Sequence, residues 1–196
     1  MEHGPRTTAR IARSVALTAV LALGATACSG NDGGDDSSTS SAKPDTKKAA
    51  TSVDAGLKAH SAGDLTAASA DYKQALKYDP SNKFAFYNLA LIDASNGNYG
   101  LAEANYRSAI KSDGEYEPAL FNLAILQTSS DPAEAISLYK RAVTVERKDA
   151  AAWLNLGLLL RDEGKVTAGN KAVLRAIALN PKLKDPKVAA TGKTAR

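Results

Sequence analysis

Residues 83–116 read K-F-A-F-Y-N-L-A-L-I-D-A-S-N-G-N-Y-G-L-A-E-A-N-Y-R-S-A-I-K-S-D-G-E-Y, and their pattern returns in residues 150–183. Each segment has an aromatic residue and a Leu-small pair, then a glycine-containing turn and a second alanine-rich stretch. Residues 49–82 and 117–149 carry the same pattern with substitutions, so the four copies are 34, 34, 33 and 34 residues long. A fixed period of this length predicts a stack of repeated structural units.

The composition favours helices for these units. Hydrophobic residues make up 44% of the chain but aromatic residues only 6%, so the core must consist mainly of Ala, Leu, Ile and Val. Alanine, which is very common here, is the strongest helix former. We therefore expect an all-α fold.

The repeated positions resemble the tetratricopeptide repeat (TPR), in which each unit is a pair of antiparallel helices. The resemblance covers residues 49–183 and implies a right-handed superhelix of about four hairpins, at 49–82, 83–116, 117–149 and 150–183. The matching residues are Phe86 and Trp153; Leu89-Ala90, Leu123-Ala124 and Leu156-Gly157; Ala68, Ala102 and Ala135; Tyr72, Tyr106 and Tyr139; Ala75, Ala109, Ala142 and Ala176; and Pro80 and Pro181.

Small residues at fixed positions allow two helices to approach closely. In the fourth repeat we expect Trp153, Leu156 and Gly157 to be buried between the helices, with Ala176 opposite. Gly169 departs from the family pattern by replacing an alanine.

Local signals mark the turns. Gly97 and Gly164 suit a sharp turn between helices. The third repeat lacks one residue at its turn, but Asp131 can cap the next helix, Pro132 suits its first position and Glu134 can complete a capping box.

The N-terminal residues 1–27 resemble a secretory signal peptide. Three arginines precede thirteen uncharged residues, 15–27, a run shorter than the ~20 apolar residues that span a bilayer. We therefore expect export, with an uncleaved membrane anchor as the alternative.

Small residues precede Cys28, the only cysteine, and resemble a bacterial lipoprotein lipobox. The resemblance implies that Cys28 carries a lipid, becomes the mature N-terminus and anchors the protein to the outer face of the cell membrane. Ala25 departs from the usual leucine, and Ala25-x-Ala27 also suits the ordinary signal peptidase. That alternative gives the same polypeptide without lipid, as a secreted protein.

The segments that flank the repeats are polar. Residues 28–48 are dominated by Gly, Ser, Asp and Lys, which predicts a disordered tether, and residues 184–196 form a basic tail. Residues 49–181 carry 14 Lys and Arg against 15 Asp and Glu, so the net charge of +4 arises at the two ends. Without a basic face in the repeats, we do not expect a nucleic-acid partner.

Candidate catalytic groups are scarce. The chain has one cysteine and two histidines, and phosphate-loop, zinc and CxxC patterns are absent from the sequence. His60 is the only histidine in the repeats and has no partner group in a catalytic pattern. We expect no enzymatic activity, metal or cofactor.

In the TPR family a second stripe on the first helix of each hairpin lines a concave groove. The resemblance therefore implies a site for a peptide or partner protein, with Tyr87 and Phe121 as anchors that face away from the hairpin contacts. Its expected residues are Phe84, Tyr87, Asn88, Leu91, Phe121, Asn122, Ile125, Leu154, Asn155 and Leu158.

Three asparagines occupy one equivalent position in successive repeats, and asparagine both donates and accepts hydrogen bonds. They would suit the backbone of an extended peptide; the alternative is that they bond a neighbouring helix. The sequence thus favours an interaction scaffold at the cell envelope. The alternatives are an accessory or regulatory subunit of an envelope enzyme complex, and a soluble carrier of an apolar ligand.

Overall fold

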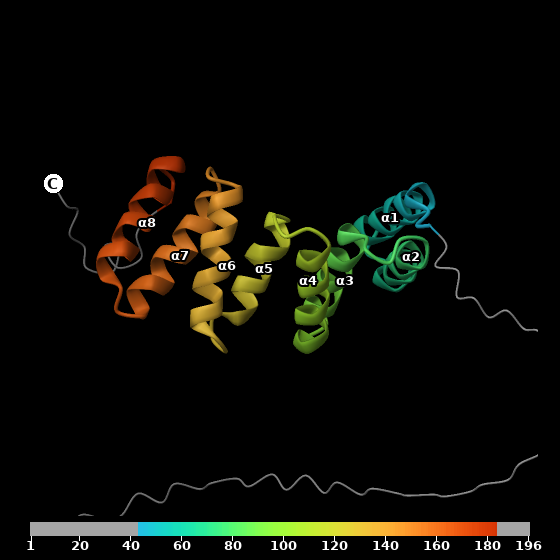
Figure 1. Ribbon diagram of the computed structural model, residues 1–196, viewed down its shortest axis with the longest axis horizontal. Helices are drawn as coiled ribbons and strands as arrows, with labels where there is room; N and C mark the ends of the chain where they lie inside the picture. Colours follow the sequence, from blue (N-terminus) through green and yellow to red (C-terminus); the bar gives the residue numbers. More distant parts are fainter. Residues whose placement is uncertain (1–42, 184–196) are drawn as a thin grey trace, which may run out of the picture. The chain divides into compact units, whose positions relative to one another are not determined.

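A computed structural model describes residues 43–183, which contain eight α-helices and no strand (Figure 1). The helices are α1 (Thr46–Ser61), α2 (Leu65–Tyr78), α3 (Lys83–Ser95), α4 (Tyr99–Ser112), α5 (Glu117–Gln127), α6 (Pro132–Val145), α7 (Ala150–Asp162) and α8 (Val166–Leu179).

The helices pair as four hairpins, α1–α2, α3–α4, α5–α6 and α7–α8, and the second helix of each hairpin contacts the first helix of the next. Figure 1 shows them following one another in chain order from α1 to α8. The expected all-α superhelix of four helical hairpins is therefore confirmed.

The first helix begins earlier than the sequence suggested. Residues 46–48 were expected in the tether, but they form the first turn of α1. The carboxylate of Asp45 caps this turn by accepting from the Lys48 amide at 3.0 Å, and the Asp45 amide donates to the Tyr78 carbonyl at the end of α2. The cap and this contact with the hairpin partner order a polar segment that its composition alone predicted to be disordered.

The signal peptide (1–27), Cys28, the rest of the tether and the basic tail (184–196) lie outside the described residues. Between residues 43 and 183, none of the helices combines the length and the apolar character needed to cross a bilayer.

Glycines shape the turns within three of the four hairpins. Gly63, Gly97 and Gly164 adopt positive φ angles of 82°, 76° and 74°, which most other residues avoid because the Cβ clashes with the backbone. In the third hairpin, Asp131 instead caps α6 by accepting from the Glu134 amide at 2.9 Å.

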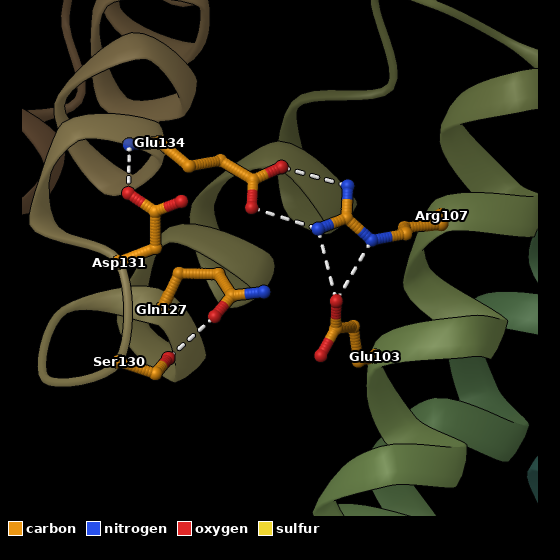
Figure 2. A network of polar contacts seen from close by, with 6 residues as sticks. All are labelled: Glu103, Arg107, Gln127, Ser130, Asp131 and Glu134. Atoms are coloured by element: carbon orange, nitrogen blue, oxygen red, sulfur yellow. Dashed lines mark hydrogen bonds and ion pairs between the residues drawn. The ribbon is translucent and has the colours of Figure 1, made fainter.

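The expected capping box at α6 is only half formed. The carboxylate of Glu134 does not accept from the backbone amide of the capping residue Asp131. It binds Arg107 of α4 through two hydrogen bonds of 2.7 Å (Figure 2). The Asp131 amide, which a capping box would pair with Glu134, donates instead to the Gln127 carbonyl at 2.9 Å. The bidentate pair with Arg107 satisfies both oxygens of the Glu134 carboxylate.

The core of the hairpins contains many alanines and one tyrosine on the second helix of each of the first three hairpins. Tyr72, Tyr106 and Tyr139 are buried at equivalent positions of α2, α4 and α6. Leu156 and Ala176 are buried as expected in the fourth hairpin, but Trp153 is only partly buried. Its indole nitrogen donates to the Arg147 carbonyl in the connection before α7 at 3.1 Å, while the ring packs against the hydrophobic core.

Candidate functional site

The ten expected groove residues lie on α3, α5 and α7, the first helices of the second to fourth hairpins. Phe84 and Ile125 are the most exposed of them, at 47% and 48%, whereas Asn88 is buried. The other seven are partly buried: Tyr87, Leu91, Phe121, Asn122, Leu154, Asn155 and Leu158.

Aromatic rings gather where the second hairpin meets the third. Tyr87 packs edge-on against Tyr116 with ring centroids 5.5 Å apart, and its centroid lies 6.0 Å from that of Tyr106. Phe84 packs edge-on against Tyr116 at 5.7 Å. Edge-to-face rings stabilise one another beyond the area that they bury, so this cluster holds the two hairpins together.

The expectation that Tyr87 and Phe121 face away from the hairpin contacts is therefore wrong. Tyr87 contacts Tyr106 of its own hairpin, and Phe121 packs against Tyr139 of its own hairpin at 5.9 Å. Each ring packs against the buried tyrosine on the second helix of its own hairpin. Part of each ring still reaches the surface.

A lysine packs against the same aromatic cluster. Lys83 at the start of α3 forms an ion pair with Asp113, which follows α4. Its Nζ lies 5.1 Å from the ring centroids of both Phe84 and Tyr116. The Lys83 ammonium, which donates to the Asp113 carboxylate, is the main cause that lowers the pKa of Asp113.

The three asparagines bond within the protein. The side-chain amide groups of Asn88 and Asn122 each donate at 2.8 Å to the carbonyl four residues earlier, and Asn122 also donates to the Tyr87 hydroxyl at 3.3 Å. Asn155 hydrogen-bonds the Tyr139 hydroxyl of the preceding hairpin. Asn122 and Asn155 thus bond a neighbouring helix, as the alternative expected, whereas Asn88 bonds only within α3. A contact of the asparagines with a partner's backbone stays a prediction.

The tyrosine hydroxyls of the cluster remain protonated at neutral pH. Burial is the main cause that raises the pKa of Tyr106 and that of Tyr116 to about 12. Burial also raises the pKa of Tyr87, an effect that the hydrogen bond from Asn122 opposes. The hydroxyls of these tyrosines are thus neutral hydrogen-bonding groups.

The structure adds two residues that the sequence did not single out. Tyr116 joins the aromatic cluster although it precedes α5, and Glu117, the first residue of α5, has a buried Oε1 atom without a hydrogen-bond partner. Burial and the nearby Asp149 and Glu146 carboxylates raise the pKa of Glu117 to about 7. Tyr116 could have been noticed in the sequence because it is the last residue of the second repeat, next to the boundary with the third. No sequence pattern pointed to Glu117.

Metal-binding clusters are not found in the described part of the chain: no three His, Cys, Asp or Glu side chains there could share an ion. His60, the only histidine of residues 43–183, lies near the end of α1, remote in sequence from the aromatic cluster.

Comparisons with solved structures identify similar folds. The crystal structure of MamA is 19% identical, with a TM-score of 0.62 over 70% of this chain and 81% of that one. YrrB, described as a TPR protein with an unusual peptide-binding site, is 21% identical, with a TM-score of 0.63 over 70% and 71%. The first TPR of Spaghetti (RPAP3), bound to an HSP90 peptide, is 20% identical, with a TM-score of 0.57 over 62% and 97%.

No curated protein sequence matches the chain. Family models do match it. A TPR repeat model matches residues 56–97, and two tetratricopeptide repeat models match residues 85–116 and 125–183. Over residues 56–116 and 125–183, the chain therefore belongs to the tetratricopeptide repeat family.

Proposed function

We propose that this protein is an interaction scaffold whose first helices bind a peptide or a segment of a partner protein. The observation that carries the proposal is the pair of exposed side chains Phe84 and Ile125, on first helices of neighbouring hairpins. Large apolar side chains that are exposed on neighbouring elements often mark an interaction surface. Partly buried rings and leucines on the same helices extend this surface.

The packing of the rings supports binding without large rearrangement. Tyr87 is held by Tyr106, Tyr116 and Asn122, so its ring and hydroxyl are already positioned before a partner arrives. A preorganised surface loses less conformational entropy on binding than a flexible one. Two proteins of similar fold, YrrB and the first TPR of Spaghetti, are described with a peptide-binding site and with a bound peptide, which supports the same use here.

The proposed place of action is the outer face of the cell membrane. Export would follow from the signal peptide in residues 1–27, and a lipid on Cys28 would anchor the chain. Two acyl chains at ~0.8 kcal/mol per buried methylene hold a protein stably on a bilayer.

Site-specific photo-crosslinking in living cells tests the binding proposal. A crosslinking amino acid replaces Phe84 or Ile125, and a matched control replaces Lys73, an exposed residue of α2. We expect the two groove positions to capture the same protein, identified by mass spectrometry, and the control not to capture it. Equal capture at all three positions, or none at the groove positions, contradicts the proposal; co-purified lipid would favour an apolar-ligand carrier.

A further inference from the structure

A cavity of about 490 Å³ opens between the start of α4 and the end of α5, at the turn edge of the second and third hairpins. Tyr99, Gly100, Ile125 and Leu126 form its apolar walls. Tyr99 is 60% exposed and Ile125 48%, so the cavity is rimmed by large apolar side chains. Ile125 is also one of the ten expected groove residues, so the cavity and the expected groove share this side chain.

A buried amide lies in the cavity wall. Gln127, the last residue of α5, is only 6% exposed, and its Oε1 accepts from the Ser130 hydroxyl at 2.6 Å. Figure 2 shows its amide nitrogen directed away from Ser130, toward the side on which Glu103 lies. Because the Gln127 oxygen already accepts from Ser130, its side-chain N–H groups can donate to a carbonyl group in the cavity.

The charged rim of the cavity is acidic. Arg107 binds both oxygens of Glu134 and also donates to Oε1 of Glu103, so one guanidinium serves two carboxylates (Figure 2). Both contacts between Arg107 and Glu103 use Oε1, which leaves Oε2 without a partner among the described residues. Glu103 lines the cavity, and the nearby Asp131 adds a further negative charge.

We propose that this cavity binds an extended segment of a partner protein in which an aliphatic or aromatic residue adjoins a lysine or arginine. The apolar side chain fills the space between Tyr99 and Ile125. The cation pairs with Oε2 of Glu103, and a backbone carbonyl accepts from the amide of Gln127. An acidic segment is disfavoured because like charges would face each other across the rim.

This inference rests on the proposed scaffold function and specifies where and how a partner is recognised. It differs from binding along the groove alone because Tyr99, Glu103 and Gln127 lie outside the ten expected groove residues. The Glu103 carboxylate beside an apolar cavity also discriminates between partners by their charge. A purely apolar strip discriminates less well.

Selection from a phage-displayed library of random heptapeptides on the immobilised full chain tests the inference. We expect enriched peptides to contain an apolar residue next to Lys or Arg. Affinities of the synthesised peptides are then measured on Tyr99→Ala and Glu103→Gln, with Leu101→Ala and Glu163→Gln as controls. Leu101 is 59% exposed but does not line the cavity, and Glu163 is an exposed residue after α7.

Each cavity variant should weaken binding at least about fivefold, as expected for interface hot spots, while both controls retain wild-type affinity. Thermal unfolding of each variant verifies that the fold is kept. Enriched peptides that lack the apolar–basic pair, or affinities that the cavity variants leave unchanged, overturn the inference. If such peptides instead lose affinity on Phe84→Ala, the groove proposal stands without the cavity; if no peptide is enriched, the cavity inference fails and the crosslinking experiment still tests the groove.

Discussion

Gly157 and Gly169 meet where α7 and α8 cross, and a Cβ atom on Gly169 would lie 2.6 Å from the Gly157 carbonyl oxygen. A Cβ atom on Gly157 would likewise lie 2.8 Å from the Val173 backbone nitrogen and 2.9 Å from the Gly169 carbonyl oxygen. Real Cβ atoms do not approach backbone atoms so closely. The glycine at position 169, a departure from the family alanine, therefore allows the two helices of the last hairpin to pack backbone against backbone.

Gly169→Ala should destabilise the protein by ~1–3 kcal/mol, because the added methyl group overpacks this crossing. Chemical denaturation measures the free energy of unfolding. The matched control is Gly100→Ala in α4, where a Cβ atom would meet nothing within 4 Å. Because Gly100 is the second residue of α4, that substitution should stabilise the protein by less than the ~0.5–1 kcal/mol expected in the middle of a helix. Equal effects of the two substitutions would show that the crossing is not tight.

Tyr87→Ala should reduce stability by ~1–3 kcal/mol, less than the cost of truncating a fully buried aromatic ring. The ring packs against Tyr106 and Tyr116, and its hydroxyl accepts from Asn122. Phe84→Ala is the comparison, since Phe84 is 47% exposed and should cost less. A wild-type melting temperature for Tyr87→Ala would mean that the ring does not join the two hairpins.

Glu117→Gln should stabilise the protein at pH 8 and have little effect at pH 4. The folded-state pKa of Glu117 is raised to about 7, mainly by burial and then by Asp149. The folded chain therefore holds a proton that the unfolded chain releases, and the wild type loses stability as the pH rises from about 4.5 to 7. The neutral amide removes this loss.

Unfolding by urea across pH 4–8 measures the difference between the wild type and Glu117→Gln. Glu115→Gln is the control, an exposed carboxylate two residues earlier. A stability difference that does not change with pH would refute the raised pKa of Glu117.

Cys28→Ala should abolish the incorporation of labelled palmitate and shift the protein from the membrane fraction to a soluble or unprocessed form. The physical reason is that the thiol of Cys28, the only cysteine, is the sole point at which the lipid would attach. Fractionation and labelling of wild type and variant measure this. A wild-type chain that never takes up label refutes the lipid anchor and favours secretion.

The repeat architecture could be predicted from the sequence because its signals are local. The turn glycines Gly97 and Gly164 and the Asp131 cap each act within a few residues of their own position, and the period of the pattern repeats such units along the chain. Helix ends and turns depend on backbone conformation and on the nearest side chains. Those predictions were confirmed, apart from the early start of α1 at Thr46 and the half-formed capping box of Glu134.

The side-chain partners, in contrast, were decided by the stacking of one hairpin on the next. Arg107 meets Glu134 of the next hairpin across 27 positions, and Asn122 meets Tyr87 of the preceding hairpin across 35. Lys83 meets Asp113 across 30 positions within the second hairpin. The period of the repeat places such positions near one another but does not choose between them. That choice depends on side-chain rotamers and burial, which exist only once the helices are packed. The sequence therefore determined the hairpins and their order. Only the tertiary structure decided that Tyr87 packs at the junction, that Oε1 of Glu117 is buried and that Gln127 lines a cavity.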